Sequence, residues 1–144
     1  MRVGKFQVKN VYFVTVERGE DLLETMQKAV EQLGVKQGVV LCGIGVQEGA
    51  NLYEVIDSNT PAAKHYEKLD GAVELCAIQG NIVDGAIHMH SVVSTEKGVW
   101  AGHVEPGNKS LITLQVMIAE ISGDRIVRKP NPGGGPTTID FEKG

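Results

Sequence analysis

One segment of this chain has the periodicity of a helix, and almost everything after it has the pattern of strands. From Asp21 to Leu33 apolar residues recur at helical spacing and form one stripe: Leu22, Leu23, Met26, Ala29, Val30 and Leu33. Asp21 followed by Glu24 resembles a capping box, and Gly34 stands where a C-terminal helix cap belongs. We therefore predict a helix over Asp21–Leu33 whose apolar stripe lies on a sheet.

Short runs rich in apolar and β-branched residues, separated by turn residues, fill most of the remaining chain. The predicted strands are Phe6–Val16, Gly38–Gly45, Ala50–Ile56, Gly71–Val83, Asp84–Ser94, Val99–Val104 and Leu111–Ile121. The cluster Asp57–Pro61 is typical of a turn. The pattern of one helix among many strands predicts an α+β domain.

The last predicted strand carries apolar residues on both sides. One side has Ile112, Leu114, Val116 and Ile118, and the other has Leu111, Met117, Ala119 and Ile121. A strand that is apolar on both sides is covered on both. We expect the helix to cover one face and another subunit to cover the other.

The C-terminal residues have a different composition. The segment Lys129–Pro136 (KPNPGGGP) is rich in Pro and Gly, which disfavour regular structure. We therefore divide the chain into a single domain over residues 1–124 and a Pro/Gly-rich tail over residues 125–144.

Length and charge limit the kinds of function. A chain of 144 residues is long enough for one compact domain. Its net charge of −4 argues against a large basic surface for nucleic acid. Met1–Lys5 lacks the apolar stretch of a signal peptide, and Cys42 and Cys76 form no Cys-x-x-Cys pair. We expect a cytoplasmic protein, not bound to a membrane, with two buried, reduced thiols.

Three of the four histidines, His88, His90 and His103, lie in two neighbouring strand-like runs. Residues two apart on a strand point to the same face, so His88 and His90 project together. If Thr95–Gly98 forms a four-residue loop with Gly98 in the left-handed conformation, antiparallel pairing places His90 opposite His103. The three imidazoles then converge on one patch of the sheet.

Three histidines with one open position are the ligand set of a reactive zinc or similar divalent metal. Zinc is the first choice because imidazole ligands suit it, while nickel, iron and copper stay open. Water or a small molecule at the open position would then be activated by the metal. The same histidines also fit a polar cluster without an ion, and an ion there can be structural. His65 lies outside this group, and we expect it at the surface.

A catalytic zinc usually works with a carboxylate that moves protons. Glu74 lies inside an apolar strand, where a charge is costly unless it is paired or used. Glu105 follows the third histidine by two residues and shares its face if the strand continues. Both are catalytic candidates only if the protein is an enzyme, and each also fits an ion pair or an exposed strand end.

Several segments, taken in order, resemble the plants-and-prokaryotes conserved domain (PPC domain) up to about Ile121. They are the residues Arg18–Asp21 before the helix, Gly43–Gly45, Gly71–Leu75, Gly80–Ile82, His88–His90 and Gly102–Val104. No single segment is specific, but the ordered set is. The His-x-His followed by Gly-His is its most telling part.

The resemblance implies an antiparallel, partly barrel-like sheet packed with the helix and assembled as a homotrimer. Plant members carry separate AT-hook motifs that bind A·T-rich DNA, and the domain itself serves trimerisation and partner contacts. This chain has no Arg-Gly-Arg core flanked by proline, so DNA stays a possible partner that neither the charge nor an AT-hook supports. In the family the glutamate at Glu74 resembles a residue of subunit or partner contact.

The histidine pattern is also similar to that of α-acetolactate decarboxylase, whose zinc is held by a His-x-His and a third histidine. Two functions from different classes follow. The first is a regulatory or DNA-associated homotrimer that carries a zinc-like metal site. The second is a metal-dependent lyase or hydrolase that acts on a small carbonyl or ester substrate.

Overall fold

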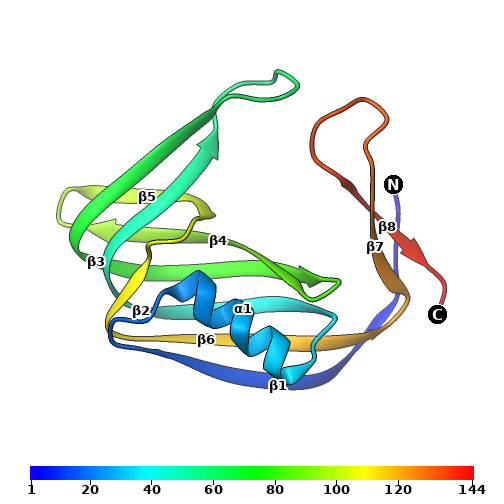
Figure 1. Ribbon diagram of the computed structural model, residues 1–144, viewed down its shortest axis with the longest axis horizontal. Helices are drawn as coiled ribbons and strands as arrows, with labels where there is room; N and C mark the ends of the chain where they lie inside the picture. The colour runs from blue at the N-terminus through cyan, green and yellow to red at the C-terminus, as the bar shows by residue number, and fades with distance from the viewer.

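The computed structural model describes all 144 residues. It contains one helix and eight strands (Figure 1). In chain order they are β1 (Phe6–Glu17), α1 (Leu22–Leu33), β2 (Gln37–Val55), β3 (Lys64–Val83), β4 (Ala86–Thr95), β5 (Gly98–Val104), β6 (Lys109–Gly123), β7 (Arg125–Lys129) and β8 (Thr138–Glu142).

Six strands form one antiparallel sheet in the order β1-β6-β2-β3-β4-β5. The end of β2 also pairs with β5, with Leu52 opposite Val104 and Tyr53 opposite His103. This second pairing closes β2, β3, β4 and β5 into a ring. The predicted antiparallel, partly barrel-like α+β architecture is therefore confirmed.

Helix α1 lies against one face of the sheet, as Figure 1 shows. The Asp21 side chain accepts a hydrogen bond from the Glu24 backbone N–H at 3.1 Å, which caps the first turn. Gly34 adopts the left-handed conformation that ends the helix. Leu22, Met26 and Val30 are fully buried, whereas Leu33 at the end of the predicted stripe is exposed.

The helix and the inner face of the sheet enclose one apolar core of 18 buried residues. Its large side chains include Met26, Leu52, Leu75, Ile82, Met89, Leu114 and Ile118. Burial of each such side chain contributes about 1.5–3 kcal/mol. Ile112 was predicted on the same side of its strand as Leu114 and Ile118, which are buried, but it is 64% exposed. The β2–β6 register shifts between Gly45 and Gln47, next to where Ile112 lies.

The two runs predicted as separate strands, Gly38–Gly45 and Ala50–Ile56, belong to one strand, β2. A register shift between Glu48 and Ala50 lets β2 bend and continue without ending. Beyond this bend β2 and β3 form a long hairpin, residues 50–69, which we call the arm. The arm rises away from the sheet in Figure 1.

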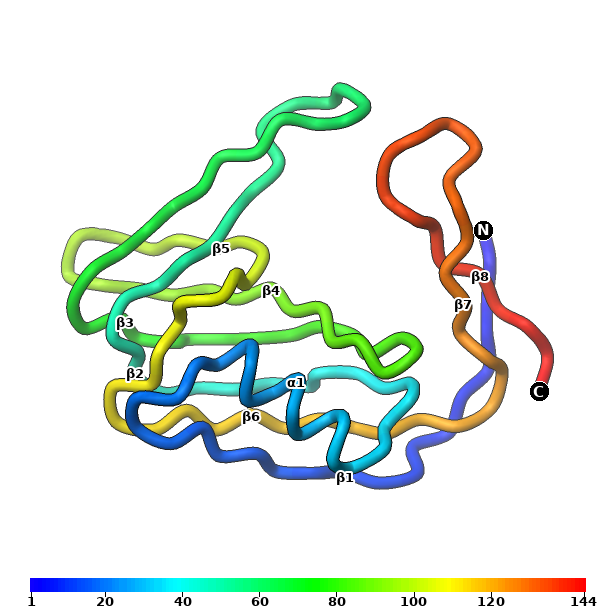
Figure 2. The backbone as a smooth tube through the Cα atoms, in the orientation of Figure 1, coloured from blue at the N-terminus to red at the C-terminus, as the bar shows by residue number.

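The C-terminal residues also form a hairpin. β7 pairs with β8 from Arg125–Glu142 to Lys129–Thr138. The Pro/Gly-rich residues between these strands have no regular structure, as predicted, but the flanking residues do. The tube in Figure 2 shows the tip of this hairpin approaching the tip of the arm.

The cysteines differ from the prediction. Cys42 and Cys76 are both free thiols and both are exposed, not buried. They lie at irregular positions of β2 and β3 and point away from the core, on the sheet face that α1 does not cover. The apolar residues beside each cysteine in the sequence did not show on which face of the sheet its thiol lies.

No helix in the structure combines the length and apolar character that crossing a membrane requires.

Candidate metal centre

The β4–β5 hairpin brings the three histidines together. His90 pairs directly with His103, as the spacing predicted. The turn is tighter than the predicted four-residue loop, because Thr95 pairs with Gly98 and only Glu96 and Lys97 lie between them. The register is unchanged, since the tighter turn keeps the same residues opposite one another.

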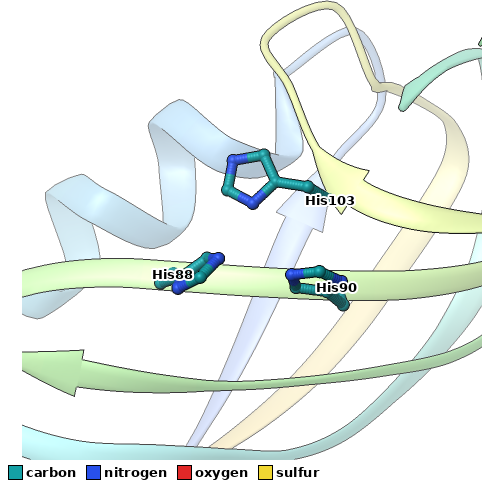
Figure 3. A group of neighbouring side chains, drawn as sticks. All are labelled: His88, His90 and His103. Atoms are coloured by element: carbon teal, nitrogen blue, oxygen red, sulfur yellow. The ribbon is translucent and has the colours of Figure 1, made fainter. Parts of the chain in front are cut away.

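The three rings face one another on the outer side of the sheet, as Figure 3 shows. Their centroids lie 5.2 Å (His88–His90), 4.7 Å (His88–His103) and 5.4 Å (His90–His103) apart. One nitrogen from each ring lies within 4.8 Å of the others. In a tetrahedral zinc site such nitrogens are ~3.3 Å apart, from Zn–N bonds of about 2.0–2.1 Å. The nitrogens are thus up to about 1.5 Å farther apart than in an occupied tetrahedral site.

The protonation state of two of the rings, His88 and His103, suits metal binding. Burial, followed by the charges of His88, His90 and Lys64, lowers the pKa of His103 to about 4. Burial, followed by His90 and Arg128, also lowers the pKa of His88. Both rings are therefore neutral at pH 7, which is the form that binds metal.

The buried Nδ1 atom of His103 has no hydrogen-bond partner. A buried polar atom without a partner is costly and calls for an explanation. In Figure 3 the His103 ring extends toward His88 and His90. An ion held by the three rings would satisfy this nitrogen, so the donor set fits a divalent metal.

Glu105 lies beside the cluster. Its Oε1 is 3.6 Å from Nε2 of His103. Because His103 is neutral, this contact is not an ion pair. A carboxylate on that side favours a proton on Nε2 and leaves Nδ1 free for the metal, a common arrangement in the outer shell of metal sites.

Glu74 is not brought to the histidines. It is exposed and pairs with Ser94 on β4. Ser94 lies four residues beyond His90, a distance of roughly 13 Å along a strand. His65 is also outside the cluster and contacts Glu67 on the arm at 3.1 Å, at the surface as expected.

An open groove with a volume of about 540 Å³ runs beside His88 and His90. Gln79 and Asn81 of β3 line it, and they pair with His90 and His88, respectively. The groove gives a small molecule access to the side of the cluster that faces away from the core.

Tyr53 is a site residue that sequence reasoning missed. Its ring lies 4.5 Å from the His103 ring, and the Nζ atom of Lys64 lies 3.9 Å above the Tyr53 ring. No local signal pointed to Tyr53, because it reaches the site through the β2–β5 pairing between segments 50 residues apart.

Three solved structures share the fold over nearly the whole chain. A metal-containing protein from Archaeoglobus fulgidus has a TM-score of 0.80 at 19% identity, covering 96% of this chain and 98% of its own. A plant- and prokaryote-conserved protein from Pyrococcus horikoshii has a TM-score of 0.78 at 24% identity, covering 100% and 99%. A protein from Bacteroides thetaiotaomicron, provisionally named as DNA-binding, has a TM-score of 0.74 at 20% identity, covering 94% and 97%.

Among curated sequences, the chain matches the bifunctional protein GlmU of Synechococcus sp. (strain JA-3-3Ab) with 26% identity over 134 residues. That match covers 92% of this chain but only 21% of the relative. The chain thus spans about a fifth of the length of this relative. The model of the Plants and Prokaryotes Conserved domain matches residues 3–122. This chain therefore belongs to the family of the Plants and Prokaryotes Conserved domain.

Proposed function

We propose that this protein is a metal-binding domain of the family, with a zinc-like divalent ion held by His88, His90 and His103. The observation that carries the proposal is the buried, unpartnered Nδ1 of His103 beside two further imidazoles. The metal-containing relative from Archaeoglobus fulgidus supports it. Three histidine nitrogens leave one coordination position for water or a small ligand.

We further propose that the chain assembles as a homotrimer. In this proposal residues 1–124 are the single domain and residues 125–144 are a C-terminal tail. The support is the uncovered face of the sheet. It exposes large apolar side chains from β1, β2 and β4: Val11, Phe13, Leu41, Ile44 and Val92. We call these five residues the outer apolar patch. Such a patch on one face is typical of a protein interface.

A regulatory, DNA-associated role is the broader context that we propose for this assembly. It is supported by the names of neighbours such as the Bacteroides thetaiotaomicron protein. The acidic charge of −4 disfavours direct binding to the DNA backbone. Contact with DNA through a partner protein is therefore the form that we propose.

A metal-dependent enzyme is the second candidate, favoured by the groove beside the histidines and by Glu105. When bound, the metal would supply polarisation of a carbonyl or ester oxygen. Glu105 is close enough to the cluster to accept or donate a proton there. Glu74 is exposed and away from the cluster, and we assign it to a subunit or partner contact. The reaction class is that of a lyase or hydrolase, in line with the histidine pattern of α-acetolactate decarboxylase.

Elemental analysis of protein purified without a histidine tag tests the proposal. We expect about one zinc-like ion per chain, and loss of that ion in a His88→Ala/His90→Ala variant. The matched control is His65→Ala, which removes an exposed imidazole outside the cluster and should leave the metal content unchanged. A chain that stays metal-free after reconstitution with Zn²⁺, Ni²⁺, Fe²⁺ and Cu²⁺ would overturn it.

A further inference from the structure

A hollow opens where the arm separates from β5. The last pair between the two segments is Tyr53–His103, and beyond it β2 continues into the arm, which rises away from the sheet in Figure 1. The space between the arm and β5 has a volume of about 160 Å³, and we call it the arm pocket. The lining residues that decide its chemistry are Leu52, Glu54, His65, Glu67 and Trp100.

Leu52 and Trp100 form the apolar side of the arm pocket. Leu52 is a fully buried core residue. Trp100 pairs with the fully buried Val93 and packs against the core, so it points to the inner face of the sheet. The pocket therefore has an indole in its wall, and an indole is the aromatic group that attracts cations most strongly.

The polar side of the arm pocket carries two carboxylates and no lysine or arginine. Glu54 pairs with His65 across the arm, and Glu67 lies two residues from His65, so all three share one face. Nε2 of His65 contacts Oε2 of Glu67 at 3.1 Å, whereas Glu54 forms no ion pair or hydrogen bond. Lys64 does not neutralise them, because it lies over the Tyr53 ring, on the other face of the arm.

This lining suits an organic cation better than a metal ion. The ligand atoms of His88, His90 and His103 converge within 4.8 Å, and the polar residues of the arm pocket form no second group of this kind. Size sets a further limit, since a cavity of ~150 Å³ holds one benzene molecule and sites for drug-sized ligands need roughly 300–1,000 Å³. A single guanidinium or ammonium group on a short alkyl stem therefore fits.

We propose that the arm pocket binds the guanidinium or alkylammonium group of a small molecule, with Trp100 beside the cation and Glu54 and Glu67 as its counter-charges. A cation beside an indole gains cation–π attraction, and carboxylates accept charge-assisted hydrogen bonds from its N–H groups. His65 orients Glu67 through their contact. The pocket lies apart from the histidine cluster, so this proposal does not depend on a bound metal.

Titration with methylguanidinium chloride tests the proposal. Trp100 is the only tryptophan of the chain, so its indole N–H gives one assignable signal in ¹H–¹⁵N NMR spectra. At constant ionic strength methylguanidinium should shift this signal saturably, whereas N-methylurea, which has a similar shape and no charge, should not. Glu54→Gln and Glu67→Gln should each weaken binding by about two- to fivefold, the range of partly exposed ion pairs. Glu48→Gln is the matched control, because Glu48 is exposed on β2 outside the arm pocket.

Three results would overturn the proposal. The first is an unshifted Trp100 signal, or equal shifts with methylguanidinium and N-methylurea. The second is the same affinity for methylguanidinium in the wild type, Glu54→Gln and Glu67→Gln. The third is a Gly-Arg-Gly tripeptide with blocked ends that binds about tenfold more tightly than methylguanidinium, because the ligand would then be a protein side chain and not a small molecule.

Discussion

At the scale of single residues, His103 links the histidine cluster to the rest of the fold. Its ring contacts His88 and His90 on one side and Tyr53 on another, and its Nδ1 is buried without a partner. The local environment keeps this ring neutral, since its pKa falls to about 4. Neutrality is what a metal requires, and it also gives the metal-free protein a pH dependence.

The stability of metal-free protein should fall as the pH drops from about 6.5 to about 4. A histidine in the unfolded chain has a pKa of ~6.5, whereas the pKa of His103 in the folded protein is about 4. Over this range the unfolded state binds the additional proton, so the stability is complete above pH 6.5 and is lost on acidification. Urea unfolding at several pH values measures the effect, and His103→Gln should reduce the slope while His65→Gln should not. Equal slopes in all three proteins would contradict it.

Glu105→Gln should weaken metal binding by about 10-fold or more, since outer-shell carboxylates typically contribute 10- to 100-fold to metal affinity. The reason is the position of its Oε1 3.6 Å from Nε2 of His103. Competition with a chromophoric chelator measures the affinity. Glu74→Gln is the matched control, because Glu74 is exposed and distant from the cluster. An unchanged affinity in Glu105→Gln would exclude this role.

At the scale of elements, the start of α1 connects the helix to the loop before β6. One oxygen of Asp21 accepts from the Glu24 N–H at 3.1 Å, and the other accepts from the Gly107 N–H at 2.7 Å. One side chain therefore caps the helix and fixes the loop that follows β5, the strand of His103.

Asp21→Ala should lower the free energy of unfolding by about 0.5–2 kcal/mol, the usual cost of losing a helix cap. Chemical denaturation followed by circular dichroism measures the change. Lys28→Ala, an exposed substitution on the same helix, should change the free energy by less than about 0.5 kcal/mol. If Asp21→Ala matches this control, the cap does not contribute to stability.

Local elements were predictable from the sequence, and long-range pairings were not. The helix follows from its apolar stripe and caps. The histidine pairing follows from a short hairpin, in which the tight turn fixes the register of the two strands. Tyr53 reaches the site from a distant segment, through the β2–β5 pairing. Periodicity describes each strand separately, so it cannot show which strands meet.

At the scale of the whole molecule, the sheet face that α1 does not cover is the feature that favours a protein partner. Phe13 is 61% exposed and Ile44 is 59% exposed, and both belong to the outer apolar patch. The face is continuous with the strands that carry the histidines, because β4 belongs to the same sheet. Assembly through this face would therefore place subunits close to the histidine cluster.

Phe13→Glu should dissociate the proposed trimer into monomers, because a charge buried in an apolar interface is not compensated. Sedimentation velocity measures the state of the protein. Val55→Glu is the control, since Val55 is similarly exposed but lies at the end of β2 in the arm, outside the outer apolar patch. A wild-type protein that sediments as a monomer at all concentrations would rule out the trimer.

Anomalous diffraction can show whether His88, His90 and His103 hold one metal ion. Crystals of tag-free protein grown with Zn²⁺ and measured at the zinc absorption edge should show one strong anomalous peak per chain. We predict that the peak lies about 2.0–2.1 Å from one nitrogen of each ring, including Nδ1 of His103. Ordered histidines with no anomalous peak among them would exclude a zinc ion at this site.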